Sequence, residues 1–302
     1  MHRRYIYAVL FVFLLYMWQL SKWQHSSLEA ERVLAGIEKY SSTEYPLSHE
    51  GRGCSCPHLR PNSSVALVSA LTDGAELALY VQSLEKLHRT TRRFTSMDTV
   101  LLTWLTGATA EGWATCNVEP VEGPAGVSNR FFQAHMYSKL RVWGLTQYEA
   151  VLYVDSDTLL LRPFDGVFSL FGTGVKLAMS VNGIGATDFN AGVMLVRPNC
   201  TELDRLVAAI NHTEHDTGLA EQGFLNAFYK GEIELLPFTY NAMVSEKAGK
   251  HRDVWMQLES EMVLLHYTCK PWHAWNCWWD DIEDLCLLWH LAATPSIGLE
   301  TR

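Results

Sequence analysis

The sequence predicts an α/β domain that follows an N-terminal membrane helix, and three observations lead to this prediction. Apolar runs of strand length alternate with longer segments of helical spacing, as in a sheet flanked by helices. Hydrophobic residues make up 48% of the 302 residues, enough for one large core. Residues 5–20 contain no charged side chain. The formal net charge of -9 argues against nucleic acid as a main partner.

The uncharged N-terminal run is YIYAVLFVFLLYMWQL, slightly shorter than the usual membrane span of about 20 residues. Arg3 and Arg4 precede it and only Lys22 follows closely, which favours a cytosolic tail at residues 1–4 and a luminal chain beyond the span. A cleaved signal peptide is the alternative, although no A-x-A-like cleavage site follows. We therefore expect a single-pass type II anchor in the Golgi or another secretory-pathway membrane.

The cysteines and glycosylation sequons suit an oxidising lumen. Sequons stand at Asn62, Asn199 and Asn211, and the chain has seven cysteines. An odd number leaves one cysteine unpaired or bridging to a second chain, so a homodimer is among the expected assemblies. Residues 21–60 are rich in polar and turn-forming residues and predict a luminal stem. The folded domain is expected at residues 61–290, with a tail at 291–302.

Within the domain, strands and helices are predicted in alternation. The apolar, partly β-branched run 64–71 predicts the first buried strand, and 75–93 has helical spacing with a basic end. Further strands are expected at 98–105, 151–161, 177–185 and 189–198, and further helices at 130–145, 201–212 and 220–231. Thr72-Asp73 and Asp155-Ser-Asp157 come at the ends of strands, where open α/β sheets gather their ligands. Both therefore point to one site.

The paired aspartates Asp155 and Asp157 predict a cation. Two carboxylates this close cost free energy through mutual repulsion and partial desolvation, unless a cation neutralises them. In D-x-D both side chains can reach one hard cation such as magnesium or manganese, together with substrate phosphates. A turn in which the aspartates accept hydrogen bonds from backbone N–H groups is the alternative.

The same stretch, DSDT, also matches the D-x-D-x-T motif of haloacid-dehalogenase-like phosphatases, and Asp280-Asp281 could stand for their later acidic pair. In those enzymes the motif ends the first strand of the domain. Here two strand-helix units precede it, so the order of elements disfavours a phosphatase.

Five motifs in order resemble the glycogenin-like branch of glycosyltransferase family 8, across roughly residues 64–275. They are SKLRVWGLTQYEAVLYVDSDTLLL, FNAGVMLVRP, EQGFLNAFY, LPFTYN and HYTCKPW. The resemblance implies the GT-A nucleotide-sugar transferase fold, with a Rossmann-like mixed sheet flanked by helices. It also implies a UDP-sugar donor, retention of anomeric configuration and a divalent metal.

The resemblance also assigns residue roles. Asp155, Asp157 and His266 would hold Mn²⁺ or another divalent metal that bridges the UDP diphosphate. Asn190, Glu221 and Gln222 would stabilise charge at the sugar, where the family usually has Asp in place of Glu221. The expected substrate-binding residues are Thr72, Asp73, Arg130, Lys139, Asn241 and Lys270. The loop between His266 and Lys270 is shorter than in other members, so we expect the Lys270 side chain to point in a different direction relative to the diphosphate.

The resulting prediction is a retaining transferase that moves a hexosyl or hexuronosyl group from a UDP-sugar to a luminal glycan, glycolipid or inositol-type acceptor. Residues 242–265 contain no Tyr, which excludes the self-glucosylation of glycogenin at that place. The alternatives are the phosphatase and a non-catalytic, membrane-anchored sugar-binding protein.

Overall fold

The computed structural model describes residues 56, 59–71, 76–105, 107–124, 133–171, 174–270 and 282–292, with only the main chain at 133–135. The predicted membrane segment, nearly all of the stem, and Thr72, Asp73 and Arg130 lie outside these ranges. None of the helices within them is long and apolar enough to cross a membrane.

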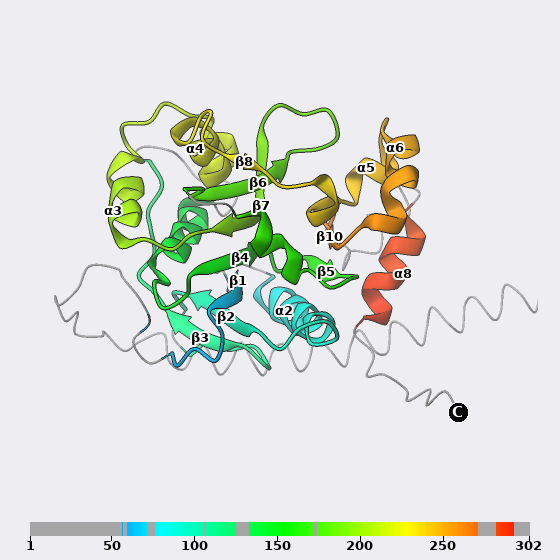
Figure 1. The fold of residues 1–302 in the computed structure, drawn as a ribbon, viewed down its shortest axis with the longest axis horizontal. Helices are drawn as coiled ribbons and strands as arrows, with labels where there is room; N and C mark the ends of the chain where they lie inside the picture. The colour runs from blue at the N-terminus through cyan, green and yellow to red at the C-terminus, as the bar shows by residue number, and fades with distance from the viewer. Residues whose placement is uncertain are drawn as a thin grey trace, which may run out of the picture. The chain divides into compact units, whose positions relative to one another are not determined.

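A seven-stranded mixed sheet forms the centre of the domain, in the order β3-β2-β1-β4-β7-β6-β8 (Figure 1). β1 is parallel to β2 and β4, whereas β4 is antiparallel to β7. Every residue of β4 is buried, as expected of a strand covered on both faces. The strands are β1 (Val65–Leu71), β2 (Asp98–Thr103), β3 (Ala114–Asn117), β4 (Ala150–Val154), β6 (Leu177–Val181), β7 (Phe189–Val196) and β8 (Glu234–Leu235).

A second, three-stranded sheet has the order β5-β10-β9, formed by β5 (Thr158–Leu160), β10 (Leu264–His266) and β9 (Ala242–Met243). The strand-type run 151–161 is therefore divided between two sheets, and the aspartates follow the end of β4 as expected. β4 ends at Val154 in the main sheet, and β5 begins at Thr158 in the small sheet because it pairs with β10. The two aspartates lie in the link between the sheets.

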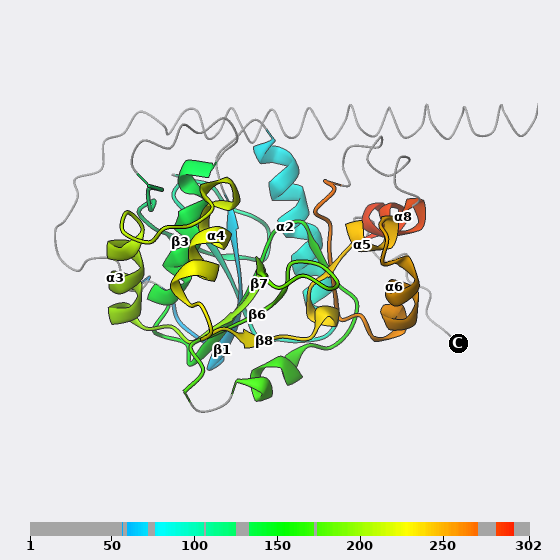
Figure 2. The same ribbon diagram turned by 90° about the horizontal axis from the view of Figure 1, so that it is seen from above.

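The helices cover both sheets. Trp143 of the 3-10 helix η1, Leu206 of α3 and Phe224 of α4 belong to the main core, whereas Trp255 of α6 and Trp289 of α8 belong to a second core around β5 and β10. Figures 1 and 2 show α5, α6 and α8 together at one end of the domain and α3 at the other. The α-helices are α2 (Leu77–Thr91), α3 (Cys200–Ala209), α4 (Ala220–Phe228), α5 (Ser245–Ala248), α6 (Arg252–Leu258) and α8 (Glu283–Leu291). The 3-10 helices are η1 (Gln133–Gly144), η2 (Asp165–Leu170), η3 (Thr217–Leu219), η4 (Phe238–Tyr240) and η5 (Glu259–Glu261).

The predicted helix at 130–145 is a 3-10 helix in its described part rather than an α-helix. The strand β3 was not predicted from the sequence. Its four residues, ATCN, lie at the edge of the main sheet, and only Cys116 among them is buried. Such a short and largely exposed strand has too weak an apolar pattern to be recognised.

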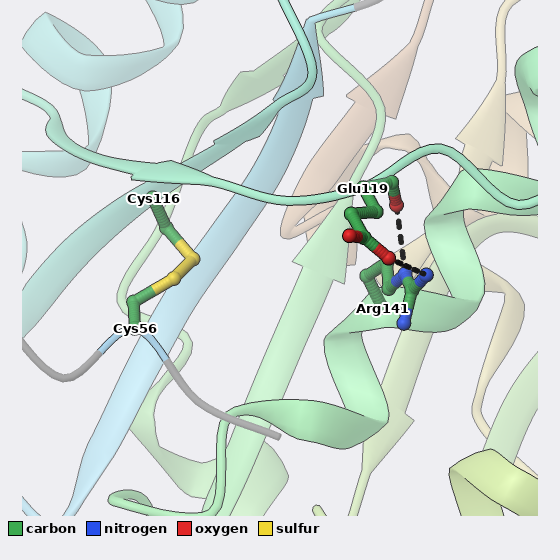
Figure 3. Close-up of a disulfide and its surroundings, with 4 residues drawn as sticks. All are labelled: Cys56, Cys116, Glu119 and Arg141. Carbon is green, nitrogen blue, oxygen red and sulfur yellow. Dashed lines mark hydrogen bonds and ion pairs between the residues drawn. A yellow bond between two sulfur atoms is a disulfide. The ribbon is translucent and has the colours of Figure 1, made fainter. Parts of the chain in front are cut away.

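A disulfide between Cys56 and Cys116 ties the segment before β1 to β3 (Figure 3). Cys200 and Cys286 are also in disulfides. Close to the first disulfide, the Arg141 Nε of η1 donates to the Glu119 carbonyl at 2.8 Å. The edge of the sheet is thus fixed both covalently and by a hydrogen bond to a neighbouring helix.

Replacing both Cys56 and Cys116 with alanine should lower the free energy of unfolding. The disulfide closes a loop with a sequence separation of 60 residues, and the loss of loop-closure entropy in the unfolded chain corresponds to about 4 kcal/mol. Urea unfolding at equilibrium would measure this as a lower midpoint. An unchanged midpoint with an unchanged slope would contradict the prediction.

Candidate active site

Strand register brings three potential metal ligands together. β10 runs antiparallel to β5 with His266 opposite Thr158, the residue directly after Asp157. The main-chain N–H of Tyr267 donates to the Asp157 carbonyl at 2.8 Å, which fixes this register. His266 Nε2 consequently lies 3.4 Å from Asp157 Oδ1 and 3.8 Å from Asp155 Oδ2. Residues more than a hundred positions apart in the sequence thus share one site.

The two oxygens of Asp155 face different partners. Oδ1 accepts hydrogen bonds from the Tyr153 hydroxyl and from Lys139 Nζ, both at 2.8 Å. Oδ2 is directed to the side of His266. One ligand atom from each of Asp155, Asp157 and His266 lies within 4.8 Å of the others. Neighbouring ligands of an octahedral ion are about 3 Å apart, so these atoms would have to move closer together to hold Mn²⁺ or Mg²⁺.

Lys139 bridges the metal cluster to the sugar-side carboxylate. Its Nζ lies 2.8 Å from Asp155 Oδ1 and 2.7 Å from Glu221 Oε1, and the side chain is buried. Burial disfavours the charge on Lys139, but the two carboxylates outweigh it and hold its pKa well above the usual value. Burial also disfavours ionisation of Asp155, yet Lys139 and His266 leave its pKa lowered.

The pKa of Glu221 is shifted in the opposite direction from the pKa of Asp155. Burial raises the pKa of Glu221 despite its contact with Lys139. Its Oε2 is buried and has no hydrogen-bond partner among the residues that the structure describes. Ala220, just before it, has φ 47° and ψ -128°, a backbone conformation that costs free energy for a residue with a Cβ. The start of α4 is therefore strained beside a carboxylate oxygen that could accept a hydrogen bond from a substrate hydroxyl.

Three side-chain amides continue the site from Glu221 toward His266. Asn190 Nδ2 donates to Gln222 Oε1 at 3.0 Å, and Asn241 Nδ2 donates to Asn190 Oδ1 at 3.0 Å. His266 Nδ1 lies 2.9 Å from Asn241 Oδ1. The expected residues Lys139, Asp155, Asp157, Asn190, Glu221, Gln222, Asn241 and His266 thus form one connected cluster.

The profile of the family described as glycosyl transferase family 8 matches residues 80–276 of this sequence. The chain belongs to glycosyl transferase family 8. The comparisons give no support to the phosphatase alternative, so the order of elements along the chain was the right guide.

This family 8 chain covers only a part of two plant relatives that it matches. UDP-glucuronate:xylan alpha-glucuronosyltransferase 1 of Arabidopsis thaliana is 34% identical over 174 residues, which are 55% of this chain and 25% of that protein. Inositol phosphorylceramide glucuronosyltransferase 1 of the same plant is 26% identical over 194 residues, 56% of this chain and 34% of that protein. The chain thus spans between a quarter and about a third of these relatives.

A solved structure with the same fold is the apo-form glycosyltransferase GlyE of Streptococcus pneumoniae TIGR4. It superposes with a TM-score of 0.52 and 21% identity, covering 76% of this chain and 61% of that one. This likeness supports the predicted GT-A-like α/β fold with a mixed sheet.

One expected diphosphate-binding residue of this family 8 chain forms an ion pair with a carboxylate of another element. Lys270 Nζ is 3.2 Å from Glu76 Oε2, at the start of α2, and Lys270 has φ 52°. The contact joins the segment after β10 to α2. Thr72, Asp73 and Arg130 lie outside the described residues, so their roles stay predictions.

Two contributors to the site were not recognised from the sequence. Gly192 of β7 lies against the imidazole of His266, where a Cβ would come within 2.8 Å of Nδ1. Tyr153, which donates to Asp155, looked like one more apolar residue of a buried strand. The glycine was visible within the FNAG motif, but the motif does not show what the glycine faces.

Metal affinity should increase with pH in this family 8 chain. Burial alone would lower the pKa of His266, but Asp157 and Asp155 raise it above its ordinary value. Below that raised pKa, a proton competes with the metal for Nε2. We expect the affinity for Mn²⁺ to rise about tenfold per pH unit up to the pKa and then to level off. Mn²⁺ titrations followed by electron paramagnetic resonance would measure this, and the His266 step should disappear in His266→Ala.

Proposed function

We propose that this chain is a retaining glycosyltransferase that uses a UDP-sugar donor and a divalent metal. The observation that carries the proposal is the convergence of Asp155 Oδ2, Asp157 Oδ1 and His266 Nε2, next to the Lys139–Glu221 ion pair. Two carboxylates and an imidazole whose Nε2 faces both of them fit Mn²⁺ or a similar ion. The ion would supply positive charge to the departing UDP diphosphate.

The protein groups around the metal site have separate roles in binding and orienting the donor sugar. Lys139 keeps its positive charge and holds Asp155 and Glu221 in fixed positions. Glu221, with one oxygen unpartnered among the described residues, is suited to accept a hydrogen bond from a donor-sugar hydroxyl. Gln222 and Asn190 lie beside it and would orient the sugar, so catalysis would depend on positioning and electrostatics.

The donor is proposed to be a UDP-hexose or UDP-hexuronic acid, and the acceptor a glycan or an inositol-type glycolipid. Support comes from the names of two relatives, which state transfer of glucuronate to xylan and to inositol phosphorylceramide. Purified full chain should release UDP from one UDP-sugar of a panel only when Mn²⁺ or a similar ion is present. Release of phosphate without UDP would indicate a phosphatase, and release of neither would indicate a binding protein.

We also propose that the domain faces the lumen of the Golgi or a neighbouring compartment, behind a type II anchor at residues 5–20. The disulfide between Cys56 and Cys116 suits an oxidising compartment, and all three sequon asparagines are exposed. The full chain made in eukaryotic cells should therefore shift in mobility after peptide N-glycosidase treatment. No shift, combined with reduced cysteines, would place the domain outside the secretory pathway.

A further inference from the structure

A directed chain of hydrogen bonds runs from β7 to the imidazole of His266, and the bonds nearest His266 are buried. The main-chain N–H of Ala191 donates to Gln222 Oε1 at 3.1 Å, and Asn190 Nδ2 donates to the same oxygen at 3.0 Å. A main-chain N–H can only donate. It therefore fixes the orientation of the Gln222 amide, with its oxygen toward Asn190.

The next two amides are oriented in the same way. The main-chain N–H of Gly192 donates to Asn190 Oδ1 at 2.9 Å, which assigns the oxygen and nitrogen of Asn190. That oxygen also accepts from Asn241 Nδ2 at 3.0 Å. The remaining atom of the Asn241 amide, Oδ1, must then face His266 Nδ1, which it does at 2.9 Å.

An amide oxygen can only accept, so His266 Nδ1 must carry the proton of the neutral ring. The lone pair then lies on Nε2, which faces Asp157 and Asp155 at 3.4 and 3.8 Å. Asn241 is fully buried, and Asn190 and His266 are less than a tenth exposed, so solvent does not compete for these bonds. An outer partner that fixes the tautomer is what a metal-binding histidine requires.

We propose that Asn241 is a positioning residue for the metal ligand His266, rather than a residue that contacts the sugar. The main chain of β7 sets its orientation through Asn190. This inference rests on the metal use proposed above. Asn190 and Gln222, which are expected to lie around the sugar, would then also help to position the metal ligand His266.

The first test measures Mn²⁺ binding by the full chain without any UDP-sugar. Asn241→Leu removes the acceptor, and we expect its affinity for Mn²⁺ to fall about 10–100-fold. Asn241→Asp keeps an acceptor for His266 Nδ1 but loses the donor to Asn190, and it should retain affinity close to that of the unchanged protein. Equal losses in the two variants, or no loss in a folded Asn241→Leu protein, would overturn the proposal.

Asn226→Asp provides a matched control. Asn226 also donates through Nδ2, to the carbonyls of Phe189 and Gln222, but its amide does not belong to the series that ends at His266. It should lose stability without a comparable loss of Mn²⁺ affinity. A loss as large as that of Asn241→Leu would attribute the effect to general disruption and reject the proposal.

The second test reads the tautomer directly, without metal. In protein with ¹⁵N-labelled histidine, long-range ¹H–¹⁵N spectra should show the neutral His266 ring protonated at Nδ1, with the signal assigned from its absence in His266→Gln. Protonation at Nε2 would refute the inference even if Asn241→Leu failed to fold. If the protein bound no Mn²⁺, the proposed metal use would fail, whereas this spectrum would still show whether the neutral His266 ring has the tautomer that Asn241 requires.

Discussion

Replacing Asp157 with asparagine or alanine is expected to lower kcat for the metal-dependent release of UDP roughly 10³-fold. An asparagine of the same shape lacks the negative charge that holds a hard cation, and losing this charge stabilisation costs several kcal/mol in the transition state. Asp157 Oδ1 lies 3.4 Å from His266 Nε2 and belongs to the proposed ligand set. Kinetics with the active UDP-sugar, together with Mn²⁺ titration, would measure the two effects separately.

Asp157 is a cleaner probe than Asp155. Asp155 also neutralises Lys139 and accepts from Tyr153, so its replacement would leave a buried cation with one partner fewer. The main-chain carbonyl of Asp157, which accepts from Tyr267, is present whatever the side chain. Asp204→Asn, on the exposed face of α3, is the control and should keep full activity. An active, metal-dependent Asp157→Asn protein would remove Asp157 from the ligand set.

The second large effect is expected from Gly192→Ala. A Cβ at position 192 would lie 2.2 Å from His266 Cε1 and 2.8 Å from Asn190 Oδ1, so the imidazole has to move away. A displacement of about 1 Å at a site of this kind can cost 10²-fold in rate. We therefore expect losses of roughly 100-fold or more in both Mn²⁺ affinity and kcat, although only one methyl group is added.

Gly166→Ala is the matched control, because a Cβ there would meet nothing within 4 Å. It should leave metal affinity and activity unchanged. Circular dichroism would establish that both variants are folded. If Gly192→Ala bound Mn²⁺ as tightly as the unchanged protein, the close packing of His266 on β7 would not matter for the site.

Much of the main sheet could be predicted from the sequence, because its strands are continuous apolar runs with clear ends. β1, β2, β6 and β7 all lie within the predicted ranges. The assignment of β4 and β5 to different sheets could not be predicted, since apolar residues stand on both sides of the aspartates. The sheet to which Thr158 belongs is decided by its pairing with His266, far away in the sequence.

The site was predicted as a set of residues but not as an arrangement. Motif order indicated Asp155, Asp157 and His266, and the structure places them together. The sequence could not show that Lys139 contacts two carboxylates at once, or that Lys270 pairs with Glu76. Such contacts depend on side chains from separate elements, and neither spacing nor composition records them.

The location of the aspartates between two sheets has a mechanical consequence. Asp155 adjoins the main sheet through its N–H bond to the Gly192 carbonyl, whereas Asp157 and His266 adjoin the small sheet. A cation bound by all three would bridge the two sheets. Its binding energy would stabilise only the state in which the ligands from both sheets are aligned. The proposed ion would therefore stabilise the alignment of the two sheets as well as supply positive charge to the donor.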